Sequence, residues 1–119
     1  DNSFDFALMV TTICFVDDPI RAFCEARRVI RKNGLMLVGF VDRDSTLGHM
    51  YEQKKHNHAF YHAATFYSTD ELLACLRTAG FNDFAFRQTL FSDNPGDETA
   101  VEAVRPGYGS GAFVVISAR

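Results

Sequence analysis

Apolar residues gather in two short runs in the first third of the chain, with a helical pattern between them. The runs at residues 4–10 and 35–41 are nearly continuous and lack strict alternation, which is typical of parallel strands covered by helices on both faces. Between them, apolar residues recur at intervals of three and four, which predicts an amphipathic helix. The pattern therefore predicts a βαβ unit, with both strands in the middle of a sheet.

This first helix has signals at both ends. Asp17 or Asp18 can cap its start and Pro19 suits its first turn, while Asn33-Gly34 is expected to end it. Basic side chains near that end oppose the negative end of the helix dipole. The apolar stripe that should face the core comprises Ala22, Phe23, Ala26, Val29 and Ile30.

The rest of the chain predicts a second helix and two more strands. Ser68 to Glu71 spell a capping box, which opens a helix through Ala79 that Gly80 ends. Residues 81–90 and 112–117 are expected to be antiparallel strands. Residues 44–66 form a polar insertion rich in His and Tyr, with a weakly amphipathic helix from residue 45 to about 55. The 119 residues are expected to form a single α/β domain.

Composition narrows the classes of function. With 47% hydrophobic and 23% charged residues and a net charge of −3, the chain has the composition of a globular protein and lacks the basic surface that nucleic acid requires. No apolar run is long enough for a membrane span, and no signal peptide is evident, so we expect a cytoplasmic protein. Cys14, Cys24 and Cys75 are expected to be reduced core thiols.

Two motifs suggest ligand sites but have plainer interpretations. The glycine-rich residues 107–111 precede a strand and do not open a helix, so they are expected to form a hairpin connection and not a nucleotide loop. The sequence His56-Asn57-His58 resembles a nuclease motif in letters only, and a solvated or pocket-lining cluster is favoured over a metal site. We therefore predict no metal.

The first helix and its flanking strands resemble a known enzyme family. The segments SFDFALMV (residues 3–10), DDP (17–19) and EARRVIRKNG (25–34), followed by an apolar strand, are similar to the second half of class I S-adenosylmethionine-dependent methyltransferases that act on small molecules. The resemblance implies a partial Rossmann-like sheet with family strands in the order 4-5-7-6, the last one antiparallel, and flanking helices. The family's glycine-rich cofactor loop lies outside these residues.

Candidate site residues follow from position and from this resemblance. The segment after the first strand lies at the carboxyl edge of a parallel sheet, where open α/β folds bind ligands, although it is also interpretable as an ordinary loop. The resemblance places Val10, Thr11 and Thr12 near the methyl group of the cofactor. Residues 44–66 are suited to form a lid, and the predicted acceptor-binding residues are Phe15, Tyr51, His56 and Tyr61.

The end of the second parallel strand supplies two charged candidates. Asp42 and Arg43 lie where they would orient an acceptor, with a salt bridge or a simple turn as the alternative. No catalytic residue is assigned, because methyl transfer requires mainly positioning and exclusion of water.

Two functions from different classes remain open. The first is methyl transfer from S-adenosylmethionine to a small-molecule acceptor, with this chain as half of the enzyme and too little of the site to bind the cofactor or act alone. The second is a non-catalytic α/β module that acts through self-association or a partner chain. The resemblance makes the first strand central in the family sheet, with the neighbour on its outer edge outside these residues. We therefore expect that edge to be bare and the chain to form a homodimer or a larger assembly. An upstream reading frame encoding a strand, a glycine-rich turn and a helix would favour the enzyme.

Overall fold

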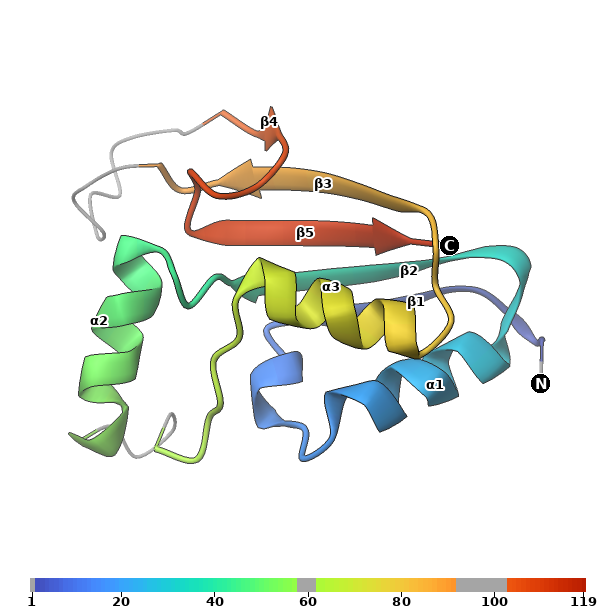
Figure 1. Cartoon of the computed structure of the whole chain (residues 1–119), viewed down its shortest axis with the longest axis horizontal. Helices are drawn as coiled ribbons and strands as arrows, with labels where there is room; N and C mark the ends of the chain where they lie inside the picture. Colours follow the sequence, from blue (N-terminus) through green and yellow to red (C-terminus); the bar gives the residue numbers. More distant parts are fainter. Residues whose placement is uncertain (1, 58–61, 92–102) are drawn as a thin grey trace.

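The strands of the chain form one open sheet with helices packed against it (Figure 1). The computed structural model describes residues 2–57, 62–91 and 103–119. Within them the strand order is β1-β2-β5-β3-β4. β1 and β2 are parallel, whereas β5 is antiparallel to both of its neighbours. The strands are β1 (Phe4–Val10), β2 (Ile30–Val41), β3 (Phe84–Thr89), β4 (Arg105–Pro106) and β5 (Phe113–Ala118).

The helices begin where the sequence supplies caps. The Asp18 carboxylate accepts a hydrogen bond from the Arg21 amide, and Pro19 occupies the first position of the helix. Ser68 and Glu71 form the predicted capping box, with both of its hydrogen bonds present. The helical segments are η1 (Ile13–Phe15), α1 (Pro19–Val29), α2 (Thr46–Lys54), η2 (Lys55–Asn57) and α3 (Thr69–Thr78).

The predicted end of the first helix is wrong by several residues. α1 ends at Val29, and Ile30 already has extended backbone angles and begins β2. The register jumps from Phe4↔Ile30 to Phe6↔Leu35, so two steps along β1 match five along β2. Asn33 takes a positive φ of 71° inside this bulge, so its left-handed backbone belongs to the bulge and not to a helix cap.

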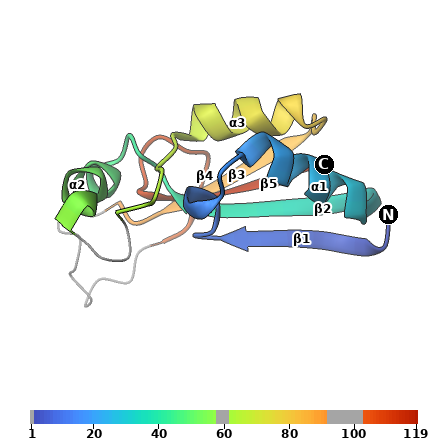
Figure 2. The ribbon, with the colours of Figure 1, turned by 90° about the horizontal axis from the view of Figure 1, so that it is seen from below.

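One face of the sheet carries the helices and the core. Figure 2 shows α1 and α3 on the same side of the sheet, and β2 and β5 send alternate side chains toward them. The stripe of α1 is buried at Phe23 and Ala26. The strand and helix side chains at the centre of this core are Met36, Val38, Phe40, Val114 and Ile116, with Leu72 and Leu76 of α3.

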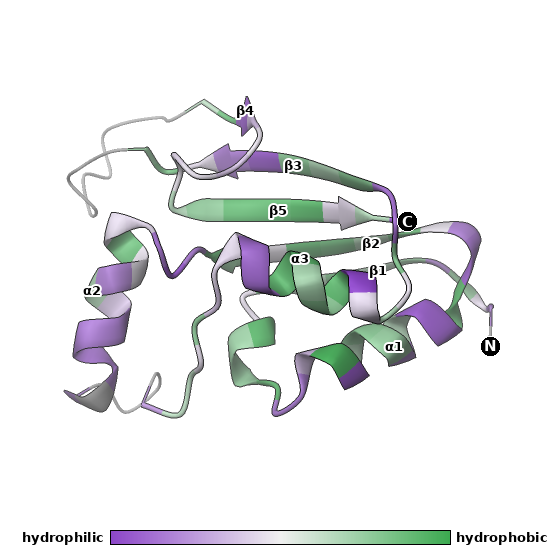
Figure 3. Ribbon diagram, viewed as in Figure 1, coloured by the Kyte–Doolittle hydropathy of each residue, from purple (hydrophilic) through white to green (hydrophobic). Residues whose placement is uncertain are grey.

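The expectation that both parallel strands lie mid-sheet with both faces covered is wrong for β1 among the described residues. β1 is an edge strand of the described sheet, and its side chains that point away from the helices are exposed by half or more. Phe4 is 58% exposed, Phe6 67%, Leu8 68% and Val10 50%. In Figure 3, β5 and most of the visible part of β2 are green, the colour of hydrophobic residues. The apolar run of β1 is real, but the helices of the described chain cover only one of its faces.

The other predicted elements agree with the structure except at one cysteine. β3 and β5 are antiparallel neighbours, as expected, and α2 begins after the Ser45 cap. All three thiols are free. Cys14 and Cys75 are half-buried, but Cys24 is exposed, because it lies beside Phe23 on α1 and one position along a helix turns the side chain away from the core.

The glycine-rich segment is a connection into β5, as predicted. Gly107 and Gly109 have positive φ values of 87° and 100°, and the segment joins β4 to β5. The side chain of Gln88, in β3, holds the glycine-rich segment in place by hydrogen bonds. The Gln88 side-chain oxygen accepts hydrogen bonds from the amides of Ser110 (2.9 Å) and Gly111 (2.8 Å), and its nitrogen donates to the Pro106 carbonyl (3.0 Å).

Candidate functional site

The carboxyl ends of β1 and β2 meet at one edge of the sheet. Val10 pairs with Gly39, and the Thr11 amide then donates to the Gly39 carbonyl at 2.8 Å. Thr11 has a positive φ of 50°, a backbone conformation that β-branched residues adopt rarely. The chain therefore turns sharply out of the sheet at this residue, where open α/β folds place their ligands.

Two hydroxyl groups follow the turn and share one acceptor. The Thr11 Oγ1 donates to the Val10 carbonyl at 2.8 Å, and the Thr12 Oγ1 donates to the same carbonyl at 3.0 Å. Both residues are exposed. With their protons engaged, the two oxygens present lone pairs to the surroundings, beside the exposed side chain of Val10.

A small pocket of about 40 Å³ opens beside this turn. Thr11 lies at its rim, and its wall comes from segments far apart in the sequence. The Tyr51 and Phe66 rings stack with their centroids 6.0 Å apart and an interplanar angle of 26°. The other wall residues, from η1, β2 and the segment before α3, are Ile13, Cys14, Phe40, Val41 and Tyr67.

The pocket is uncharged at neutral pH. None of the residues named around it carries a charged side chain. Burial raises the pKa of the Cys14 thiol, and it also raises the pKa of the Tyr67 hydroxyl, with smaller contributions from Cys75 and Glu71. Both groups therefore stay protonated. An uncharged, partly dry pocket favours the neutral form of whatever enters it.

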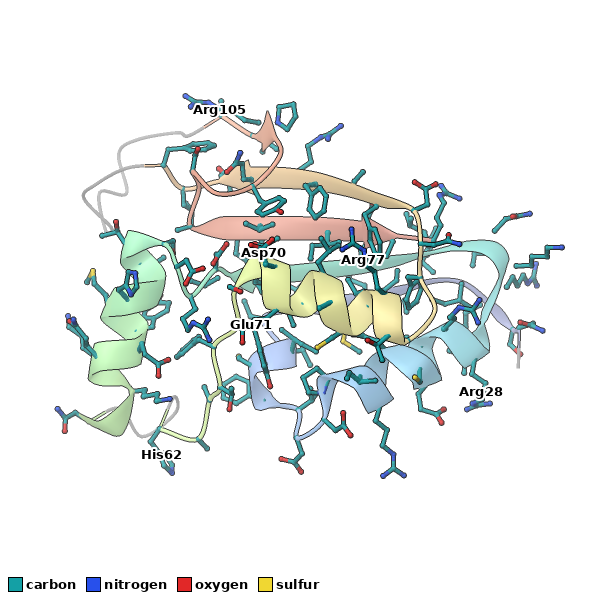
Figure 4. The ribbon with its side chains drawn as sticks, in the orientation of Figure 1. Arg28, His62, Asp70, Glu71, Arg77 and Arg105 are labelled. Carbon is teal, nitrogen blue, oxygen red and sulfur yellow. The ribbon has the colours of Figure 1, made fainter. Side chains whose placement is uncertain are left out.

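Asp42 and Arg43 connect the segment after β2 to the start of α3. Asp42 is 5% exposed, and its carboxylate accepts hydrogen bonds from the Thr69 Oγ1 at 2.7 Å and the Asp44 amide at 2.9 Å. Arg43 pairs with Glu71 (Nη2 to Oε1, 2.5 Å). In Figure 4, Glu71 lies at the start of α3 on the opposite side from Asp70. These two residues form structural contacts, the alternative that the sequence left open.

The first part of the chain matches a methyltransferase family. The model of a family described as a methyltransferase domain matches residues 1–38. An uncharacterized protein of Methanocaldococcus jannaschii is 41% identical over 99% of this chain and 57% of its own length. An uncharacterized protein of Mycobacterium tuberculosis is 35% identical over 97% of this chain and 41% of its own length.

A solved structure supports the same resemblance. The protein from Thermotoga maritima described as a SAM-dependent methyltransferase, possible histamine N-methyltransferase, is 55% identical and superposes with a TM-score of 0.94, over 99% of this chain and 56% of that one. The chain therefore resembles the class I S-adenosylmethionine-dependent methyltransferases. It spans about half the length of the relatives named here. A methyltransferase from Methanosarcina mazei, 20% identical with a TM-score of 0.58, shares the fold.

The methyltransferase fold brings some of the predicted site residues together. Val10, Thr11 and Thr12 are adjacent at the turn, and Tyr51 reaches the same pocket as Thr11. Phe15 lies in η1 and is 40% exposed. His56 lies in η2, but its side chain is outside the described part of the structure, and Tyr61 lies outside the described residues altogether. The proposed lid at residues 44–66 is therefore described only in part.

Sequence reasoning missed six residues of the pocket wall. These residues are apolar or aromatic and were assigned to strands, to the loop after β1, or to the approach to α3: Ile13, Cys14, Phe40, Val41, Phe66 and Tyr67. One signal was available, because Phe66 and Tyr67 stand directly before a capping box and so had to lie against the start of α3. Within the described residues, no group of three His, Cys, Asp or Glu side chains is placed to hold a metal ion.

Proposed function

We propose that this chain forms the acceptor-side part of a methyltransferase that transfers the methyl group of S-adenosylmethionine to a small molecule. The observation that carries the proposal is the sharp Thr11 turn at the carboxyl edge of the parallel strands. The uncharged pocket of about 40 Å³ beside this turn has room for one small group of an acceptor. When bound, the cofactor supplies a sulfonium methyl group that an acceptor lone pair can attack. Val10, Thr11 and Thr12 fit an apolar and hydroxyl-lined wall for its methionine part.

The residues of the chain would act by positioning and by excluding water. Tyr51 and Phe66 present stacked rings to the pocket, a surface that suits a planar or apolar acceptor. A neutral amine has the lone pair that the reaction requires, and the pocket favours this form over the ammonium ion. The amine would gain the methyl group as the sulfonium S–C bond breaks and leaves a neutral thioether, and the methylated ammonium product would then release a proton to solvent. Histamine, which appears in the description of the Thermotoga maritima protein, is the first acceptor to test.

The proposal treats this chain alone as inactive. Three exposed residues, none of them charged, offer a contact surface for the cofactor but no partner for its charged groups. Calorimetric titration of the chain with S-adenosylmethionine should therefore give negligible heat. Micromolar binding, equivalent to about −8 kcal/mol, would contradict this part of the proposal. The three free thiols suit a reducing compartment, so the proposal includes a cytoplasmic location.

Activity should be tested in the complete reading frame that encodes the chain. Deuterated S-adenosylmethionine and a panel of amines that includes histamine should yield a mass-labelled product. Tyr51→Ala should raise KM for the acceptor more than it lowers kcat, because it removes a pocket wall, whereas Arg87→Gln on exposed β3 should change neither. Methyl transfer that is equally fast in Tyr51→Ala would refute the assignment of this pocket.

The open edge of β1 supports a second candidate function, self-association of this chain through a second copy. Four apolar side chains of β1 are at least half exposed, and no strand of the described chain pairs with its outer edge. Such an edge can pair with another chain. No described helix is long and apolar enough to cross a membrane.

Light scattering tests the second candidate. At micromolar concentration the chain should have at least twice its monomer mass of 13.4 kDa. Leu8→Lys should break the assembly or abolish soluble expression, because it places a charge in the apolar row of β1, whereas Arg87→Gln should leave the mass unchanged. A monomer that melts cooperatively would refute self-association and leave the methyltransferase proposal untouched.

A further inference from the structure

A second and larger hollow lies at the opposite end of the parallel strands from the pocket. Its volume is about 460 Å³. Figure 1 shows this end of the sheet at the right, with the turn from α1 into β2 and the end of β5. Ile30 and Gly34 form part of its floor. β1 separates the two sites by six residues, or about 20 Å of strand, so the hollow is not part of the methyl-transfer pocket.

Basic side chains reach the hollow from three separate parts of the chain. Arg27 comes from the last turn of α1, Arg31 and Lys32 come from the bulge of β2, and Arg119 follows β5. The whole chain has only 12 Lys and Arg residues and a net charge of −3. A gathering of four cations in one hollow is therefore a local reversal of the overall charge.

Two of these cations are held in place by packing and hydrogen bonding. A Cβ atom built at Gly80 would lie 2.8 Å from the Arg27 Nε, so the missing side chain of Gly80 makes room for the guanidinium. The Arg119 Nη1 donates to the carbonyl of Asn33 at 3.0 Å. These contacts fix the stems and leave further guanidinium N–H groups for a ligand.

Neighbouring acids and the helix dipole do not account for the cluster. Asp83 is the acidic residue of the hollow wall, and Asp5 approaches Arg31 at 3.5 Å with both side chains more than 60% exposed. Basic residues in the last turn of α1 would offset its dipole. That reason applies to Arg27 but not to Arg119, which comes from the other end of the sequence.

We propose that this hollow binds a small molecule that carries a diphosphate or two neighbouring phosphate groups. Guanidinium groups match the geometry of phosphate oxygens and bind them through paired hydrogen bonds. A volume of about 460 Å³ lies within the usual range of small-molecule sites, 300–1,000 Å³, and exceeds the needs of a single phosphate. The hollow is a ligand site separate from methyl transfer.

Inorganic pyrophosphate is the probe for this site. Titration of the chain at low ionic strength should show saturable binding with one site per chain, measured by calorimetry. Amide resonances of Asn33, Gly34 and Asn82 should shift, whereas those of Thr11 and Tyr51 should not. The double variant Arg31→Gln/Lys32→Gln should weaken binding at least tenfold, which is about 1.4 kcal/mol.

A charge-matched variant separates a site from general attraction. Arg21→Gln/Arg87→Gln removes the same charge from two exposed positions outside the hollow and should leave the affinity within twofold. Thermal melting should show that both double variants fold, and Lys32→Gln alone replaces the first double variant if it does not. An equal loss in both double variants, or no saturable binding at millimolar pyrophosphate, would overturn the proposal.

Discussion

β1 and β2 present one closed face and one open face. On the closed side, Met36 and Val38 have no exposed surface, whereas on the open side Phe6 and Leu8 are 67% and 68% exposed. The residue types on the two sides are similar, so hydrophobicity does not separate the faces. The difference lies in α1 and α3, which lie on one side only (Figure 2). Apolar residues therefore show that both faces of these strands could be buried. The placement of the helices decides which face is buried in this chain.

The strongest test of this comparison removes the same side chain from each side of the molecule. Leu76→Ala on α3 should lower the free energy of unfolding by roughly 2–5 kcal/mol, because Leu76 is fully buried and its loss leaves a cavity. Urea denaturation measures the change. A loss below about 0.5 kcal/mol, as at surface sites, would show that the closed face is not the core.

Gln88 of β3 is a buried residue that joins the sheet to the glycine-rich segment by hydrogen bonds. Gln88→Ala should cost about 1–3 kcal/mol, because the amides of Ser110 and Gly111 lose their acceptor near the protein interior. Gln88→Glu keeps the acceptor but loses the donation to the Pro106 carbonyl and should recover part of the loss. Equal unfolding free energies for Gln88→Ala and the unchanged chain would mean that the glycine-rich segment keeps its conformation without the Gln88 hydrogen bonds.

A smaller effect is expected from acid, at the start of α3. Hydrogen bonds from Ser68 lower the pKa of Glu71, and Arg43 lowers it further. A carboxyl group with a lowered folded-state pKa stabilises the protein above its unfolded-state pKa, and this contribution is lost as the pH falls through the folded-state value. The Tm difference between the chain and Glu71→Gln should therefore shrink in acid. Glu71 is partly exposed, so the effect should stay under about 1 kcal/mol.

The smallest effect is predicted on the open face. Leu8→Ala should change the unfolding free energy of the separated monomer by less than about 0.5 kcal/mol, because its side chain is 68% exposed. Urea titrations at increasing chain concentration distinguish the monomer from an assembly. If Leu8→Ala costs as much as Leu76→Ala at every concentration, the open face is covered within a single chain, and the comparison fails.

Local signals in the sequence predicted the elements well and their surroundings poorly. The Asp18 cap and the capping box at Ser68 depend on residues within one helical turn, and both are present. The end of α1 was placed too late, because Asn33-Gly34 suits a left-handed backbone equally in a helix cap and in a strand bulge. Only the pairing of β2 with β1 chooses between them.

The candidate site shows the same limit more strongly. Thr11 could be proposed as a site residue because it follows a strand, and Tyr51 because it lies in a segment rich in His and Tyr. The partners Cys14, Phe40 and Phe66 reach the pocket only when η1, β2 and the approach to α3 converge. Their sequence separation leaves no periodicity to detect. The basic side chains near the end of the first helix were visible in the sequence, but Arg119 joins them only through the antiparallel placement of β5.

The bulge in β2 has a consequence for the length of the chain. Ile30 and Leu35 are five residues apart, an odd number, whereas their partners Phe4 and Phe6 are two apart. Side chains alternate along a strand, so the odd count lets Ile30 enter the core while Leu35 faces the opposite side. A deletion within residues 31–33 is therefore expected to move either Ile30 out of the core or Leu35 out of its pairing with Phe6.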